Sequence, residues 1–104
     1  MSDWVEIGPV SEVPVSGARV ILQGEQRIAV FRNSQDEIFA LRDRCPHKGG
    51  FLSQGIVHHK TVTCPLHNWK IGLENGEAIA PDSGCTRHFK VKLEDKLIFI
   101  DIDK

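Results

Sequence analysis

Two short segments, Cys45-Pro46-His47-Lys48-Gly49-Gly50 and Cys64-Pro65-Leu66-His67-Asn68-Trp69, decide what kind of protein this sequence encodes. Each segment supplies one thiolate and one imidazole, with the spacing Cys-x-His in the first and Cys-x-x-His in the second. The sixteen residues between the two pairs, 48–63, are enough for a hairpin that returns the chain to its starting point. We therefore predict one site on which four ligands converge: Cys45, His47, Cys64 and His67.

The mixture of donors indicates an iron–sulfur cluster. Thiolates suit ferric iron with bridging sulfides, and neutral imidazoles on the second iron remove negative charge and raise the reduction potential. Two cysteines on one iron and two histidines on the other form a Rieske-type [2Fe-2S] centre. Gly49 and Gly50 permit close approach of backbone N–H groups to the sulfides, and Pro46 and Pro65 stiffen the loops beside each cysteine.

A structural zinc site is the chief alternative for the same four residues, and it would make the chain a non-redox interaction module. Zinc sites of Cys2His2 composition usually place like residues together, as C-x(2–4)-C followed by H-x(3–5)-H. This sequence instead pairs unlike residues in each half. The spacing therefore favours the iron–sulfur cluster over zinc.

Outside the two segments the sequence is typical of an antiparallel all-β domain, because short β-branched and aromatic runs alternate with turn residues. We expect an all-β sandwich or open barrel that carries a small cluster-binding subdomain of two loops at about residues 42–76. The whole chain, 1–104, is expected to form one domain. The predicted strands are Trp4–Ile7, ended by Gly8-Pro9, then Ala18–Leu22, Arg27–Arg32, Glu37–Leu41, His88–Leu93 and Leu97–Ile102, with brief strands at Val57 and Thr61–Thr63 and a turn at Glu94-Asp95-Lys96.

Composition excludes several classes of function. The 13 Lys and Arg nearly cancel the 14 Asp and Glu, so no overall positive field attracts nucleic acid or an anionic membrane. No apolar run approaches membrane-spanning length, and residues 1–6 lack the pattern of an export signal. We expect a cytoplasmic protein. No phosphate-binding loop, dinucleotide fingerprint or nucleophile elbow is present, so no catalytic residue is predicted.

The remaining cysteine and histidines receive no chemical role. Cys85 is left over once four ligands are assigned, and we expect it to be a small buried side chain. His58, His59 and His88 lack a cysteine at matching spacing and are expected to be solvated or hydrogen-bonded.

Basic residues flank the two segments and are candidates for steering an acidic redox partner, although a solvated rim would show the same composition. They are Arg42, Arg44, Lys48, Lys60 and Lys70.

The two segments resemble the boxes of the Rieske family. The resemblance implies that the same four residues are the cluster ligands and that Leu66 and Trp69 shield the cluster. High-potential members of the family carry an extra cysteine in each box, where this sequence has Gly50 and Leu66. The chain is therefore similar to the lower-potential, ferredoxin-like branch.

Within that branch, nearly the whole chain resembles the small subunit of assimilatory NAD(P)H-dependent nitrite reductase, except that Phe51 stands where a proline is common. This resemblance implies an electron-transfer role beside a large subunit that holds FAD, an iron–sulfur cluster and siroheme and reduces nitrite to ammonium with NAD(P)H. A free Rieske ferredoxin that serves an aromatic-ring dioxygenase shares the same boxes and remains the alternative. The segments that carry the resemblance are the two boxes, Leu52-Ser53-Gln54-Gly55, Asn68-Trp69-Lys70-Ile71 and Ala80-Pro81-Asp82-Ser83-Gly84-Cys85.

Overall fold

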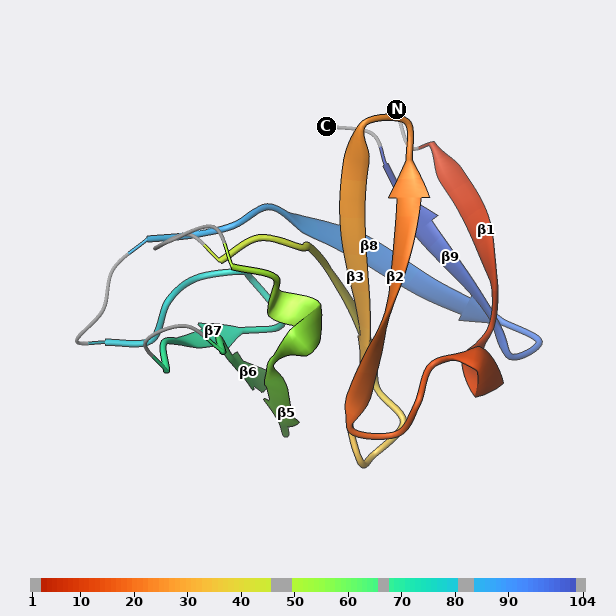
Figure 1. The fold of residues 1–104 in the computed structure, drawn as a ribbon. Helices are drawn as coiled ribbons and strands as arrows, with labels where there is room; N and C mark the ends of the chain where they lie inside the picture. Colours follow the sequence, from red (N-terminus) through yellow and green to blue (C-terminus); the bar gives the residue numbers. More distant parts are fainter. Residues whose placement is uncertain (1–2, 46–49, 66–67, 81–83, 103–104) are drawn as a thin grey trace.

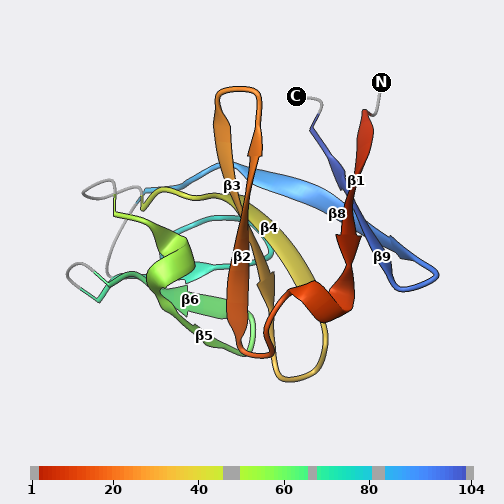
Figure 2. The same ribbon diagram turned by 45° about the vertical axis from the view of Figure 1, so that its right-hand side comes forward.

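Six antiparallel strands form one curled sheet in the computed structural model, which describes residues 3–45, 50–65, 68–80 and 84–102. The strand order is β1-β9-β8-β4-β3-β2, and every pairing in it is antiparallel. Figures 1 and 2 show the sheet curving from β2 at one edge to β1 at the other, as half of a barrel. The all-β prediction is confirmed. The strands are β1 (Trp4–Pro9), β2 (Gly17–Gln23), β3 (Gln26–Arg32), β4 (Ile38–Arg42), β8 (His88–Glu94) and β9 (Leu97–Asp101).

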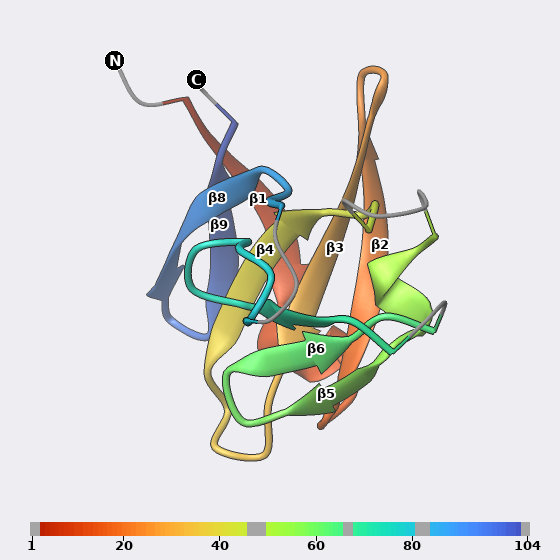
Figure 3. The ribbon, with the colours of Figure 1, turned by 90° about the vertical axis from the view of Figure 1, so that its left-hand side faces the viewer.

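A second, smaller sheet packs against β3 and β4, as Figure 3 shows from the side. It consists of β5 (Ile56–His58), β6 (Thr61–Thr63) and β7 (Lys70–Gly72), paired antiparallel in the order β5-β6-β7. The helical elements in the described ranges are two 3-10 turns, η1 (Val10–Glu12) and η2 (Leu52–Gln54). Among the described residues no helix has the length and apolar character that crossing a membrane requires.

Strands β3 and β4 are buried on both faces. On β3, Ile28 and Val30 pack into a core inside the half-barrel, whereas the alternating residues Ala29 and Phe31 pack into a second core beneath the small sheet. Successive side chains of a strand point to opposite faces, so a strand between two cores must be apolar at consecutive positions. This requirement explains the uninterrupted apolar run in the middle of β3.

Two strand predictions need correction. β1 does not stop at Gly8 but continues to Pro9, because a bulge between Glu6 and Gly8 absorbs one residue and Gly8 adopts a φ of 116°. Pro9 is tolerated there because β1 is the edge strand of the sheet. β7 was not predicted at all, since Gly72 reads as a turn; it forms because Ile71 is fully buried and pairs with Val62.

The predicted turn between the last two strands is present. Asp95 and Lys96 connect β8 to β9 and both have positive φ, 52° and 65°. Positive φ at both central residues is the signature of the type I′ hairpin turn, which matches the twist of the paired strands.

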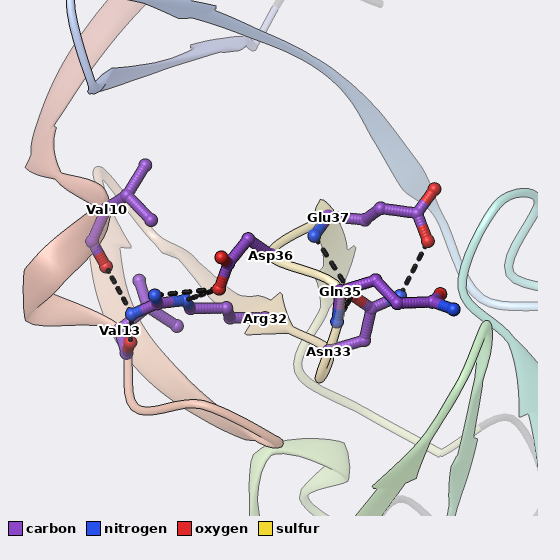
Figure 4. A network of polar contacts seen from close by, with 7 residues as sticks. All are labelled: Val10, Val13, Arg32, Asn33, Gln35, Asp36 and Glu37. Carbon is purple, nitrogen blue, oxygen red and sulfur yellow. Dashed lines mark hydrogen bonds and ion pairs between the residues drawn. The ribbon is translucent and has the colours of Figure 1, made fainter.

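Asn33 connects the large sheet to the small one. This buried side chain ends β3: its oxygen accepts the backbone N–H groups of Gln35 and Glu37, and its amide donates to the carboxylate of Glu37 (Figure 4). The same amide also donates to the carbonyl of His59, in the turn between β5 and β6, over 3.1 Å. Beside it, Arg32 pairs with the exposed Asp36.

We expect Asn33→Ala to lower the free energy of unfolding by roughly 2–4 kcal/mol, because it leaves several backbone groups without partners. Asp36→Asn removes only an exposed ion pair and should cost less than about 1 kcal/mol. Urea unfolding of both variants measures the difference, and equal losses would contradict the role given to Asn33.

Candidate metal centre

The first predicted ligand loop leaves the large sheet at the end of β4. Cys45 lies three residues beyond that strand, and its backbone N–H donates to the carbonyl of Gly50 over 2.7 Å. This hydrogen bond joins the two ends of the predicted ligand segment, Cys45 and Gly50. The chain then enters η2, where Leu52 is fully buried.

The second loop is the end of the β6–β7 hairpin. Cys64 follows β6 directly, and its N–H donates to the carbonyl of Trp69 over 2.6 Å. That bond continues the strand ladder one step beyond the pair Thr63 and Lys70. Asn68, inside the loop, has a φ of 57°, a conformation that asparagine adopts more readily than most residues.

The ends of the two loops are therefore joined by the same kind of hydrogen bond. Each begins at a cysteine whose N–H is bound to the carbonyl five residues later, so four residues span each loop. Both thiols are buried, with Cys45 1% and Cys64 0% exposed, and both belong to the apolar cluster beneath the small sheet. The two cysteines, although nineteen residues apart in the sequence, thus lie in one apolar cluster.

Gly55 permits the close approach of the two loops. It follows η2 on the departing arm of the first loop, where a Cβ would overlap the carbonyl oxygen of Thr63, the residue just before Cys64. Ile56, the next residue, pairs with the same Thr63. Because glycine has no side chain, the arm of one loop can lie on the backbone that leads into the other.

The histidine half of the predicted site lies outside the described residues. His47, His67 and the predicted shield Leu66 fall in the ranges to which no structure is assigned here. Trp69 is partly buried and packs against the apolar cluster that contains both cysteines, as a shielding side chain would. Within the described ranges, no group of three or more His, Cys, Asp or Glu side chains is placed to hold a metal ion.

Three polar residues beside the first loop were not singled out from the sequence: Arg27, Asp43 and Ser53. The side chains of Arg27 and Ser53 both donate a hydrogen bond to the Asp43 carboxylate. The local signals in the sequence are that Asp43 stands two residues before a predicted ligand and that Ser53 lies in a segment that carries the family resemblance. The contact partners come from β3 and η2 and become neighbours only through the fold.

Predictions for the other candidate residues have different outcomes. Cys85 is exposed, so its predicted burial is wrong. It forms an isolated antiparallel β-bridge with Glu77, which is also exposed. His58, His59 and His88 are exposed, as expected. Lys60 does not flank the loops but lies at the opposite end of β6 from Cys64, near Glu74.

The donors present fit a site that takes one cysteine from each loop. Buried sulfur is a soft ligand, and thiolates of this kind suit iron–sulfur clusters. The two thiols lie in one apolar cluster and each loop is closed by a backbone hydrogen bond of its own cysteine, so neither cysteine is merely a surface residue of a turn.

Comparisons with known proteins agree with this arrangement. The model of the Rieske [2Fe-2S] domain matches residues 3–90. The anthranilate 1,2-dioxygenase ferredoxin subunit of Burkholderia cepacia is 30% identical over 103 residues, which cover 98% of this chain and 94% of the relative.

Two solved structures have the same fold. The putative NADH-dependent nitrite reductase small subunit from Mycobacterium tuberculosis superposes with a TM-score of 0.88 at 16% identity and covers 100% of this chain and 98% of its own. The ferredoxin of carbazole 1,9a-dioxygenase from Nocardioides aromaticivorans IC177 superposes with a TM-score of 0.86 at 19% identity and covers 98% and 100%.

The curled sheet, the small sheet and its two cysteine loops define a small iron–sulfur electron-transfer protein. The chain belongs to the Rieske [2Fe-2S] domain family. Its cofactor is accordingly a [2Fe-2S] cluster, and the zinc alternative is set aside.

The burial of the thiols predicts their reactivity. In the native protein a maleimide should label one of the three cysteines quickly, the exposed Cys85, and should reach Cys45 and Cys64 only after unfolding. Mass spectrometry of digested samples locates the label, and Cys85→Ser should abolish the fast phase. Early labelling of Cys64 would contradict the described packing.

Proposed function

We propose that Cys45 and Cys64 bind one iron of the cluster and His47 and His67 the other, and that the chain is the electron-transferring small subunit of an assimilatory NAD(P)H nitrite reductase. The observation that supports the ligand set is the pair of loops closed in the same way, each with a buried cysteine at its closing hydrogen bond. A cysteine and a histidine from each loop complete the set that the family requires.

The chain's own residues prepare this site in two ways. The closing hydrogen bonds of Cys45 and Cys64 fix the backbone from which each thiolate projects. Leu52, fully buried, and Trp69, partly buried, keep water away from the sulfur side of the site. When bound, the cluster supplies one-electron oxidation and reduction. The protein therefore contributes position and a water-poor environment rather than an acid, a base or a nucleophile.

The assignment to nitrite reductase rests on the segments around the boxes. Asn68-Trp69-Lys70-Ile71 and Ala80-Pro81-Asp82-Ser83-Gly84-Cys85 resemble that small subunit beyond what ligand binding needs. On this proposal the partner is a large subunit with FAD, an iron–sulfur cluster and siroheme, on which nitrite is reduced to ammonium at the expense of NAD(P)H.

A second candidate has an observation of its own. The curated relative reported above is a dioxygenase ferredoxin subunit, with 30% identity along nearly the whole chain. That similarity supports a free Rieske ferredoxin that delivers electrons to an aromatic-ring dioxygenase. Both candidates use the same loops and differ only in the partner.

The exposed basic residues beside the loops suit an acidic partner surface in either case. Arg42 and Arg44 precede the first loop, Lys70 follows the second, and all three are exposed. Opposite charge on a partner would speed the encounter, and salt would screen it.

The ligand proposal predicts the spectrum of three serine variants. Cys45→Ser and Cys64→Ser should lose the visible absorbance and the EPR signal of the reduced cluster, because a hydroxyl is a poor ligand for this iron. Cys85→Ser is the matched control and should keep both signals, with iron and sulfide near two atoms each per chain, as a [2Fe-2S] cluster requires. An unchanged spectrum in both ligand variants would contradict the assignment.

Reconstitution tests the partner. Added to a siroheme-containing large subunit, the chain should restore NAD(P)H-dependent nitrite reduction, and the rate should fall as ionic strength rises. The matched experiment adds it to a ferredoxin reductase and a ring-hydroxylating dioxygenase. Turnover in the second system without turnover in the first would overturn the nitrite reductase proposal in favour of the ferredoxin.

A further inference from the structure

One carboxylate joins the two arms of the first ligand loop. Asp43 precedes Cys45 by two residues and is 2% exposed. Its Oδ1 accepts the backbone N–H of Ser53, and its Oδ2 accepts the hydroxyl of Ser53 and the Nε–H of Arg27, each over 2.7 Å. Ser53 belongs to η2, on the far side of the loop.

The Asp43–Ser53 contact encloses the closing bond between Cys45 and Gly50. The first loop is thus closed twice: by backbone atoms at Cys45 and Gly50, and by a side chain two residues before and three residues after them. The second closure is not redundant, because the arm that follows the loop is η2 and not a strand paired with β4.

The second loop needs no such side chain. It is the tip of a hairpin, so the pairs formed by β6 and β7 hold its ends in register from Thr63 and Lys70 onward. The comparison between the loops indicates the structural role of Asp43. In the first loop a buried carboxylate occupies the place that strand pairing has in the second.

Arg27 holds the same arm from β3. Its Nε–H donates to Asp43, its guanidinium lies 4.1 Å from the ring centroid of Phe51, and its carbonyl accepts the N–H of Asp43. A buried carboxylate is costly unless donors satisfy it, and here a guanidinium, an amide and a hydroxyl do so. No buried side-chain nitrogen or oxygen among the described residues is left without a partner.

We propose that Asp43 is a positioning residue for the cluster: by binding Ser53 and Arg27 it fixes the shape of the first loop and thereby the place of the Cys45 thiolate. The inference rests on the ligand role of Cys45 under the proposed function. It adds a residue that touches neither iron nor sulfide and acts through the backbone of the loop.

The test is the rate of cluster loss from the purified holoprotein. Asp43→Asn keeps the size of the side chain but replaces an accepting oxygen by an NH2 group that faces at least one donor in either orientation of the amide. Bleaching of the visible absorbance by a chelator should be roughly 10- to 100-fold faster, the scale on which partners of metal ligands affect metal retention. The EPR spectrum of the reduced variant should also shift, because the thiolate geometry changes. Ser53→Ala removes only the hydroxyl contact and should give a smaller change in the same direction.

Two control variants separate positioning from general destabilisation. Asn33→Ala weakens the fold at the end of β3 away from Arg27 and at the end of β6 away from Cys64. While folded, this variant should bleach at the wild-type rate. Asp36→Asn removes a carboxylate without touching the loop and should behave as wild type. Should Asp43→Asn keep the wild-type rate and EPR spectrum, or should Asn33→Ala bleach as fast as Asp43→Asn, the inference is overturned.

The same experiment distinguishes this inference from the proposal on which it rests. If Cys45→Ser retains the cluster, the ligand assignment is wrong. If Cys45→Ser loses the cluster while Asp43→Asn and Ser53→Ala match the wild type in bleaching rate and EPR spectrum, the ligand assignment stands and only the role of Asp43 is rejected. Should Asp43→Asn not fold, Ser53→Ala carries the test alone, and a wild-type bleaching rate and EPR spectrum in it overturn the inference.

Discussion

The burial of β3 and β4 on both faces is the constraint on which the rest of the structure depends. Consecutive residues of these strands enter different cores: Val30 and Ala40 pack inside the half-barrel, and Phe31 and Leu41 pack against the small sheet. Neither sheet covers its apolar face alone. The site that contains Cys45 and Cys64 is therefore joined to the main body of the protein by packing.

The local features of the site could be predicted from the sequence because each is contained in one short segment. The donor types and spacing of the boxes identified an iron–sulfur centre, and β-branched runs identified most strands. What could not be predicted depends on contacts between distant segments. Strand β7 exists because Val62 and Ile71 pair, and β1 reaches Pro9 only because an edge strand tolerates a bulge and a proline.

The contacts of Asp43 belong to this second kind. Arg27, Asp43 and Ser53 come from three separate elements, and no periodicity or spacing relates them. The surroundings of Cys85 could not be predicted either. Its small apolar side chain suggested burial, but the residue is exposed, in a β-bridge with Glu77 outside both cores. Residue type predicts chemistry better than it predicts surroundings, because surroundings are set by the whole fold.

The paired closure of the loops bears on the speed of the redox step itself. Electron transfer is slow when ligands must move between the oxidised and reduced states, since that movement adds a reorganisation energy to the barrier. Here the N–H groups of Cys45 and Cys64 are already bound within the protein, and both thiols lie in a close-packed core that resists deformation. On the proposed ligand assignment, such a frame favours the same ligand positions in both oxidation states and keeps this reorganisation energy small.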